Sequence, residues 1–413
     1  MTTSLHAFAG YGVELEYMIV DRHSLSVRPI ADELLRRAAE GDSAQVERGM
    51  MGWSNEVALH QIEIKNLSPG PDLESLPAAY QAEVQAINRL LEPMDARLMP
   101  TAMHPWMDPL RETRLWSGEH AGIYRTYDRI FGCQKHGWSN IQSMHLNLPF
   151  ADDAEFARLH AAVRLVLPIL PALAASSPIA EGRPRGFMDF RMEAYRTHEI
   201  KIPALLGQVI PDTAASRADY EAHIFAPMYR DIAPFDPEGV LRHEWLNSRG
   251  AAPRFERNAI EIRVIDSQEC PQADLAIAAA ITAVVRALYD AKWASLETQQ
   301  SIATDDLAGI FRACIHDGEQ AVIDHAGYLQ RLAFPGRRCR GGELWWHLVG
   351  ATLGDGAHWE RWREPLQNIL EYGPLARRIL RAVGPGSERS RLEAVYGELC
   401  GCLEQGRLFL GLN

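Results

Sequence analysis

The chain has 413 residues, of which 47% are apolar and 23% are charged, so its composition is that of a folded globular protein. Its formal net charge of −12 argues against a nucleic-acid binder, which needs clustered lysine and arginine, and against attachment to an anionic membrane. We expect small-molecule partners and leave a homo-oligomer open.

Six cysteines are scattered through the chain, and the one close pair, Cys400 and Cys402, lacks the second pair that a zinc site needs. The first ten residues show neither the basic start nor the apolar run of a signal peptide. The two most apolar stretches, 159–176 and 275–288, are interrupted by arginine or proline. These features predict a cytoplasmic protein with reduced thiols, in which both stretches are core helices.

Strand-like alternation is concentrated in the first two-thirds of the chain, between segments of helical periodicity. In chain order the pattern predicts a strand at 13–20, a helix at 31–40, a strand at 58–66, a helix at 76–91, strands at 97–103 and 143–148, a helix at 154–175, a strand at 259–265 and a helix at 272–295. Beyond residue 296 no segment predicts a strand, and helical periodicity recurs at 305–317, 320–331 and 364–381, with a loop at 335–343.

This distribution of elements favours an α+β fold around a mostly antiparallel sheet, because the strands lack the regular helix spacing of a parallel one. We expect a sheet-containing domain at 1–295 and a helical region at 296–413 packed on it, since no linker-like stretch separates them.

The first predicted strand, within "YGVELEYMIV", places Glu14, Glu16 and Met18 on one face. The two carboxylates then lie roughly 7 Å apart, which in a single strand is typical of a solvated edge. Three further segments repeat the arrangement: "NEVALHQIEIKN", "SMHLNLPF" and "NAIEIRVID" each pair an apolar face with a face of Glu, His, Asn or Arg. The polar set is Glu14, Glu16, Glu56, Glu63, His145 and Glu261, with Lys65 and Arg263 as its cations.

If these strands are neighbours in one sheet, five carboxylates converge. Two unit charges 4 Å apart repel by about 4 kcal/mol at an effective dielectric near 20, and several such pairs would exceed a domain's stability of roughly 5–15 kcal/mol. Either a cation occupies the site or some carboxylates are protonated. Oxygen donors with one imidazole suit Mg²⁺ or Mn²⁺, so the pattern predicts a divalent metal site.

The ordered motifs resemble the type 2 glutamate–cysteine ligase family of carboxylate–amine ligases, in the glutamine-synthetase-like superfamily. The matching stretches span residues 12 to 266: "GVELEYMIVD", "EVALHQIE", "TAMHP", "HLN", "AASSP" followed by G-x3-G-x2-D-x-R, and "AIEIRVID". The chain departs from the family where it has "HLNLP" in place of H-x-H-x-G, so the resemblance does not define the amine acceptor.

The resemblance implies a sheet whose concave face forms a funnel for ATP and two or three magnesium ions. It implies that the metal ligands are Glu14, Glu16, Glu56, Glu63, His145 and Glu261, and that Glu63, Glu261 and Arg263 form the catalytic set, with Arg263 facing the γ-phosphate. ATP contacts are expected from Lys65, Arg254, Arg257 and Arg263. Substrate contacts are expected from Arg191, Asn147 and His104, with a structural histidine held in a turn as the alternative for His104.

The function that these expectations describe is an ATP-dependent ligase, which activates a carboxylate as an acyl phosphate and joins it to an amine with release of ADP and phosphate. No residue is assigned as the base for the amine. Two alternatives stay open: a metal-dependent amide hydrolase, and a non-catalytic relative that binds a nucleotide or an amino acid.

Overall fold

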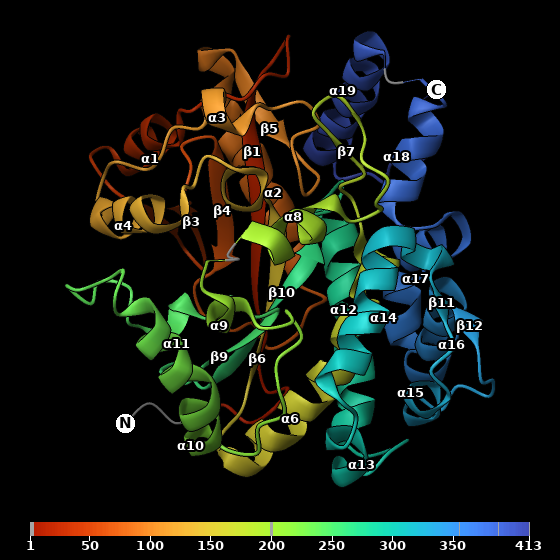
Figure 1. Cartoon of the computed structure of the whole chain (residues 1–413). Coiled ribbons are helices and arrows are strands. Elements are labelled where there is room, and N and C mark those ends of the chain that lie inside the picture. The colour runs from red at the N-terminus through yellow and green to blue at the C-terminus, as the bar shows by residue number, and fades with distance from the viewer. Residues whose placement is uncertain (1–3, 199–200, 355, 387, 413) are drawn as a thin grey trace.

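The computed structural model describes residues 4–198, 201–354, 356–386 and 388–412 (Figure 1). Its centre is an eight-stranded sheet in the order β2-β3-β4-β1-β6-β10-β9, with β5 paired to β1, and every pairing is antiparallel. The mostly antiparallel sheet predicted from the alternation is therefore confirmed. Its strands are β1 (Gly12–Asp21), β2 (Gln45–Arg48), β3 (Met51–Asn55), β4 (Gln61–Asn66), β5 (Ala96–Met99), β6 (Ser143–Pro149), β9 (Ala251–Arg254) and β10 (Ala259–Asp266).

One face of the sheet is apolar and packs against long helices. On β1 the residues Val13, Leu15, Tyr17 and Ile19 are at most 1% exposed. The helices of this core are α2 (Leu76–Leu91), α6 (Asp153–Val166) and α12 (Pro271–Tyr289), and α12 contacts both of the others. Two helical stretches, Asp153–Ala174 and Pro271–Tyr289, are long and apolar enough to cross a membrane, but their most apolar windows are 94% and 78% buried inside the protein. The interpretation of both stretches as core helices is confirmed.

The opposite, polar face of the sheet is overhung by short helices and turns, which lie in front of the strands in Figure 1. These are α4 (Ala121–Phe131), α5 (His136–Ser139), α8 (Phe190–His198), α9 (Pro203–Leu206), α11 (Ala226–Ile232) and the 3₁₀ turn η4 (Glu244–Leu246). The remaining elements of this part are α1 (Ala31–Ala39), η1 (Glu92–Met94), α3 (Pro109–Glu112), η2 (Leu167–Ile169), α7 (Leu170–Ala174), β7 (Ile179–Ala180), β8 (Arg183–Pro184), α10 (Arg217–Tyr220) and the π-helical turn η3 (Glu221–Phe225).

Several predicted boundaries are wrong, each for a local reason. The hairpin of β2 and β3 and the edge strand β9 are missing from the prediction. β3 contains glycine, serine and asparagine and β9 contains proline, which are rare in strands, and β2 is a four-residue strand with one buried residue, too short for a clear alternation. The strand predicted at 97–103 ends at Met99, since Thr101 takes a φ of 79°. The helix predicted at 154–175 is interrupted after Val166, where Pro168 and Pro171 lack the backbone donors that a continuous helix needs.

The last third of the chain is helical, as predicted, but it also holds a two-stranded ladder of β11 (Val322–Ile323) and β12 (Cys339–Arg340). The expectation of no strand beyond 296 is therefore wrong, and the helix predicted at 320–331 begins only at Ala326. Gly373, with a φ of 91°, and Pro374 divide the predicted helix at 364–381. The helices are α13 (Leu296–Gln300), α14 (Thr304–Asp317), η5 (Gly318–Gln320), α15 (Ala326–Arg331), α16 (Gly341–Thr352), α17 (Ala357–Tyr372), α18 (Leu375–Val383) and α19 (Arg389–Gln405).

A second apolar cluster joins α18 and α19 to the outer end of the sheet. Met18 and Val20 lie on the face of β1 that carries the glutamates, and both are fully buried with residues of these two helices. A buried ion pair, in which Arg378 Nη1 donates to Glu269 Oε1 at 2.5 Å, fastens α18 to the segment before α12. The division of the chain at residue 295 stays a prediction.

Candidate active site

The strand register places the predicted polar residues side by side. Glu14 of β1 lies opposite His145 of β6, and Glu16 of β1 lies opposite Glu63 of β4. Because side chains alternate between faces, these pairs all project from the polar face. The next strand continues the row, since Glu261 of β10 is paired with Asn147 of β6.

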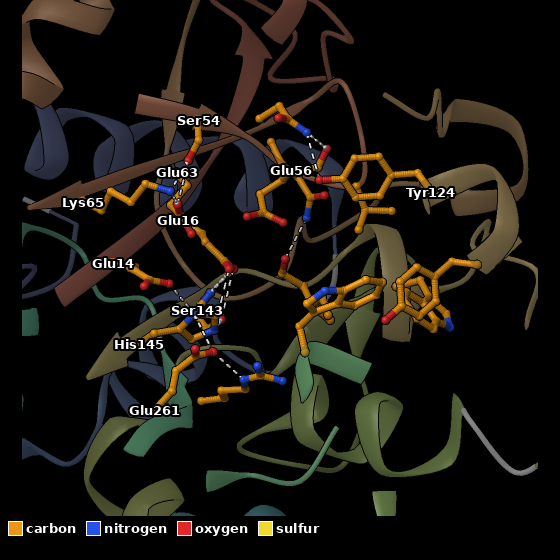
Figure 2. A pocket seen from close by; sticks show the side chains of 18 of the residues that line it. Glu14, Glu16, Ser54, Glu56, Glu63, Lys65, Tyr124, Ser143, His145 and Glu261 are labelled. Carbon is orange, nitrogen blue, oxygen red and sulfur yellow. Dashed lines mark hydrogen bonds and ion pairs between the residues drawn. The ribbon is translucent and has the colours of Figure 1, made fainter. Parts of the chain in front are cut away.

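A cavity of about 670 Å³ opens over this face. Figure 2 shows Glu14, Glu16 and Glu261 turned toward His145, Glu63 beside Lys65 and Ser54, and Tyr124 on the opposite side of the cavity. The sequence-predicted residues that line it are Glu14, Glu16, Glu56, Glu63, Lys65, His145, Arg191, Arg254, Arg257, Glu261 and Arg263. The structure therefore brings together all six expected metal ligands and all four expected ATP contacts.

Two groups of ligand atoms within this cavity are close enough to hold a divalent cation. Glu14, Glu63 and His145 form one group, and Glu16, Glu56 and Glu63 form the other, with the ligand atoms of each group within 4.8 Å of one another. Glu63 belongs to both groups. Within the described parts of the chain, the Glu56 carboxylate has neither a hydrogen bond nor an ion pair, although it faces Glu16 and Glu63. These oxygen donors with one imidazole fit Mg²⁺ or Mn²⁺.

His145 is the electrostatic centre of the first group. Its Nδ1 donates to Glu14 Oε2 at 3.0 Å, and its Nε2 lies 2.9 Å from Ser143 Oγ. Burial disfavours the charged imidazole, but the hydrogen bond to Glu14 and the neighbouring carboxylates of Glu16 and Glu261 outweigh it and raise the pKa of His145 to about 9. Glu14, despite its burial, has a lowered pKa because His145 donates to it.

The second group is less fully compensated: Lys65 pairs with Glu63 and His145 Nε2 lies 3.7 Å from Glu16 Oε1, but Glu56 has no such partner among the described residues. Burial raises the pKa of Glu16, although the backbone N–H and hydroxyl of Ser143 both donate to its Oε2. Burial also raises the pKa of Glu56 well above its usual range, and the charges of Glu16 and Glu63 raise it further. Because the ionised forms are disfavoured without a partner, a cation at this position would relieve the repulsion.

Four of the basic residues of the cavity, Lys65, Arg191, Arg254 and Arg263, are already engaged with carboxylates. Glu261 accepts from Arg254 Nη1 at 2.9 Å and from Arg263 Nε at 2.5 Å, and these two guanidinium groups outweigh burial and hold the pKa of Glu261 at about 2. A register shift in β10 between Ile262 and Ile265 marks a β-bulge next to Arg263. On β4, Lys65 Nζ donates to Glu63 Oε1 at 2.7 Å.

Arg191 lines the cavity but is itself 2% exposed. Its Nε donates to Asp266 Oδ1 at 2.5 Å, and the other oxygen of Asp266 accepts from Ser176 N and Ser177 Oγ. The substrate contact predicted for Arg191 therefore involves a guanidinium group that a buried carboxylate already holds in place.

His104 and Asn147 do not line the cavity. His104 is fully buried, its Nε2 lies 2.8 Å from the carbonyl oxygen of Leu25, and burial lowers its pKa to about 3. This geometry corrects the predicted substrate contact in favour of the structural alternative. Asn147 Nδ2 donates to Glu14 Oε1 at 3.2 Å, so its amide helps to orient the carboxylate of a predicted metal ligand.

The aromatic residues of the cavity are absent from the prediction. Tyr124 and Tyr127 come from α4, Trp138 from α5, Tyr195 from α8 and Trp245 from η4. Their rings lie on helices and turns, where an aromatic residue is more often part of a core than of a binding site, so the sequence alone carries no distinct signal for them.

An α+β fold whose antiparallel sheet gathers carboxylates, an imidazole and arginines in one cavity defines the class, and a solved glutamate–cysteine ligase has the same fold. Within that class, the chain belongs to the glutamate-cysteine ligase family 2, whose model matches residues 11–398. An uncharacterised protein of Archaeoglobus fulgidus is 35% identical over 277 residues, which cover 67% of this chain and 74% of the relative.

Two solved structures share the fold. The glutamate–cysteine ligase of Francisella tularensis, solved in complex with AMP, superposes with a TM-score of 0.62 at 12% identity and covers 95% of this chain and 88% of its own. A bifunctional glutathione synthetase from Pasteurella multocida has a TM-score of 0.62 at 15% identity and covers 97% of this chain and 53% of its own.

Proposed function

We propose that the protein is an ATP-dependent carboxylate–amine ligase whose donor is the γ-carboxylate of glutamate. The observation that carries the proposal is the presence, in one cavity, of two cation-binding groups that share Glu63 and a row of guanidinium groups beside them. The family assignment supports the same class of reaction.

The reaction needs activation because a free carboxylate has no good leaving group. Attack of a carboxylate oxygen on the γ-phosphorus of ATP forms a C–O–P bond and releases ADP. The amine nitrogen then attacks the carbonyl carbon, the C–N bond forms, and the bond to the phosphate oxygen breaks with its electron pair. The products are an amide, ADP, phosphate and one proton.

The chain's own residues supply positioning and charge for these steps. Arg263 and Arg254 border the cavity and are oriented by Glu261, so they present fixed positive charge to phosphate oxygens. Glu63 and Lys65 are held together with Ser54, whose hydroxyl donates to Glu63 at 2.7 Å. Magnesium or manganese ions held by the two cation-binding groups would neutralise the phosphate charges of ATP.

The test is ADP release by the full chain with ATP, Mg²⁺ and a panel of carboxylates, with hydroxylamine as the nucleophile. Hydroxylamine is small and converts an activated carboxylate to a hydroxamate, which mass spectrometry identifies. We expect glutamate to give both ADP and the γ-hydroxamate in equal amounts.

Glu261→Gln should lower ADP formation at least 100-fold, because it removes the charge that orients two guanidinium groups. The matched control is Glu256→Gln, in the exposed turn between β9 and β10. Wild-type rates in Glu261→Gln, or turnover of an amide without ATP, would contradict the proposed function. Nucleotide binding without turnover of any carboxylate would do so as well.

A further inference from the structure

We propose, resting on the ligase function above, that the aromatic side of the cavity binds the acceptor, and that the acceptor is a primary amine with an apolar or aromatic body and no carboxylate. The site is the aromatic wall, defined as Tyr124, Tyr127, Trp138, Tyr195 and Trp245. All five residues line the cavity, and Tyr124 lies across it from Glu14, Glu63 and His145 in Figure 2.

Ring contacts link four of the five residues of the aromatic wall, all but Tyr124. The centroid of Tyr127 lies 4.9 Å from that of Trp138 and 5.9 Å from that of Trp245. The ring centroid of Trp138 lies 5.0 Å from that of His198, and the centroid of His198 lies 4.7 Å from that of Tyr195. The elements α4, α5, α8 and η4 thus supply ring faces and edges that line the cavity, which suits an apolar or aromatic body.

The charges near the wall favour an ammonium group over a carboxylate. Glu56, itself a member of the second cation-binding group, lies between Glu16 and Tyr124 in Figure 2, and Asn55 Nδ2 donates to Tyr124 Oη at 3.0 Å. Glu119 also lines the cavity and is exposed. A carboxylate seated among these side chains would meet negative charge and ring faces, whereas an ammonium group is attracted by both.

The wall is aromatic by definition, and four of the five arginines and lysines that line the cavity among the described residues are paired with carboxylates. Lys65 pairs with Glu63, Arg191 with Asp266, and Arg254 and Arg263 with Glu261. The remaining cation, Arg257, lies in the exposed turn between β9 and β10, three residues from Arg254. An α-amino acid would therefore lack the guanidinium fork that normally recognises its carboxylate.

The experiment compares matched acceptors with the full chain, ATP, Mg²⁺ and glutamate. Each pair differs only in the carboxylate: phenylalanine and phenethylamine, tyrosine and tyramine, cysteine and cysteamine. We expect kcat/KM for the aromatic amines to exceed that of their amino acids at least tenfold. If kcat/KM for an amino acid equals or exceeds that for its amine, the inference is overturned. It is also overturned if glutamate gives hydroxamate with hydroxylamine but neither member of any pair is accepted.

The hydroxylamine reaction separates this outcome from failure of the proposed function. Hydroxylamine needs no wall to reach the activated carboxylate, so hydroxamate shows that activation occurs whichever acceptor is used. If no carboxylate gives hydroxamate or ADP, it is the ligase proposal that has failed.

Variants locate the acceptor within the cavity. Trp138→Leu and, as a half-buried alternative, Tyr124→Leu should raise the KM for phenethylamine about three- to tenfold and the KM for ATP less than twofold. The control is Trp346→Leu, a tryptophan of α16 that is 45% exposed and outside the cavity. A rise in the KM for ATP instead would place the nucleobase on the wall and overturn the inference.

Discussion

The imidazole of His160 makes the folded protein sensitive to acid. The side chain is 1% exposed, and neither of its ring nitrogens has a hydrogen-bond partner in the described chain. It packs against Phe156 and Tyr220, with ring centroids at 5.3 and 5.8 Å. Burial, and then the charge of Arg164, lower its pKa to about 3. His160 is therefore neutral in the folded protein wherever the unfolded chain, with a pKa of about 6.5, begins to take up a proton.

The sign of the effect follows from this difference. The folded-state pKa is the lower one, so the unfolded state binds more protons and stability falls as the pH drops below about 6.5. Between pH 7.5 and pH 5.0 this one residue should lower the free energy of unfolding by about 2 kcal/mol, with a limiting slope of about 1.4 kcal/mol per pH unit. The loss continues until the pH approaches 3, where the folded protein also takes up the proton.

The variant that tests this is His160→Leu, which keeps a similar side-chain volume and cannot titrate. Urea unfolding followed by circular dichroism at pH 7.5, 6.5, 5.5 and 5.0 gives the free energy of unfolding for both proteins. We expect the variant to be the more stable protein at pH 5.0, with an advantage about 2 kcal/mol larger than at pH 7.5. An advantage that is the same at both pH values would show that His160 takes up its proton in the folded state and would refute the reasoning.

Three further changes test the site and the packing. Glu63→Gln removes a ligand from both cation-binding groups and should weaken Mn²⁺ binding about 10- to 100-fold by calorimetry, whereas Glu47→Gln on exposed β2 should leave it unchanged. Asp266→Asn leaves the buried guanidinium of Arg191 without its carboxylate and should lower the free energy of urea unfolding by about 3–5 kcal/mol; a loss under 1 kcal/mol would contradict the pairing. Arg378→Met breaks the ion pair of α18 and should make the residues after α19 more sensitive to limited proteolysis, and unchanged cleavage would count against that role.

The carboxylate cluster could be predicted because β-strand alternation fixes which side chains share a face. Glu14 and Glu16 are two residues apart, and that spacing alone places them together. Their partners Glu63 and His145 depend on the strand order and register, which arise from packing between distant segments and leave no local signature. The family resemblance supplied that missing information.

Two polar side chains predicted to contact substrate have partners, distant in the sequence, that a motif does not reveal. His104 occupies a recognisable motif, but the carbonyl of Leu25 is its partner. Arg191 is likewise committed to Asp266, 75 residues away in the chain. The sequence identifies groups capable of binding a ligand, whereas only the structure shows which of them a neighbour has already engaged.

The C-terminal third contacts the polar face of β1, although no described residue beyond Arg263 lines the cavity. Along that face Glu14 and Glu16 are followed by Met18 and Val20, so its character changes from charged to apolar within one strand. The apolar half is fully buried with α18 and α19, and the charged half opens to the cavity. The C-terminal helices therefore cover one end of the polar face of β1 and keep bulk water from its apolar half.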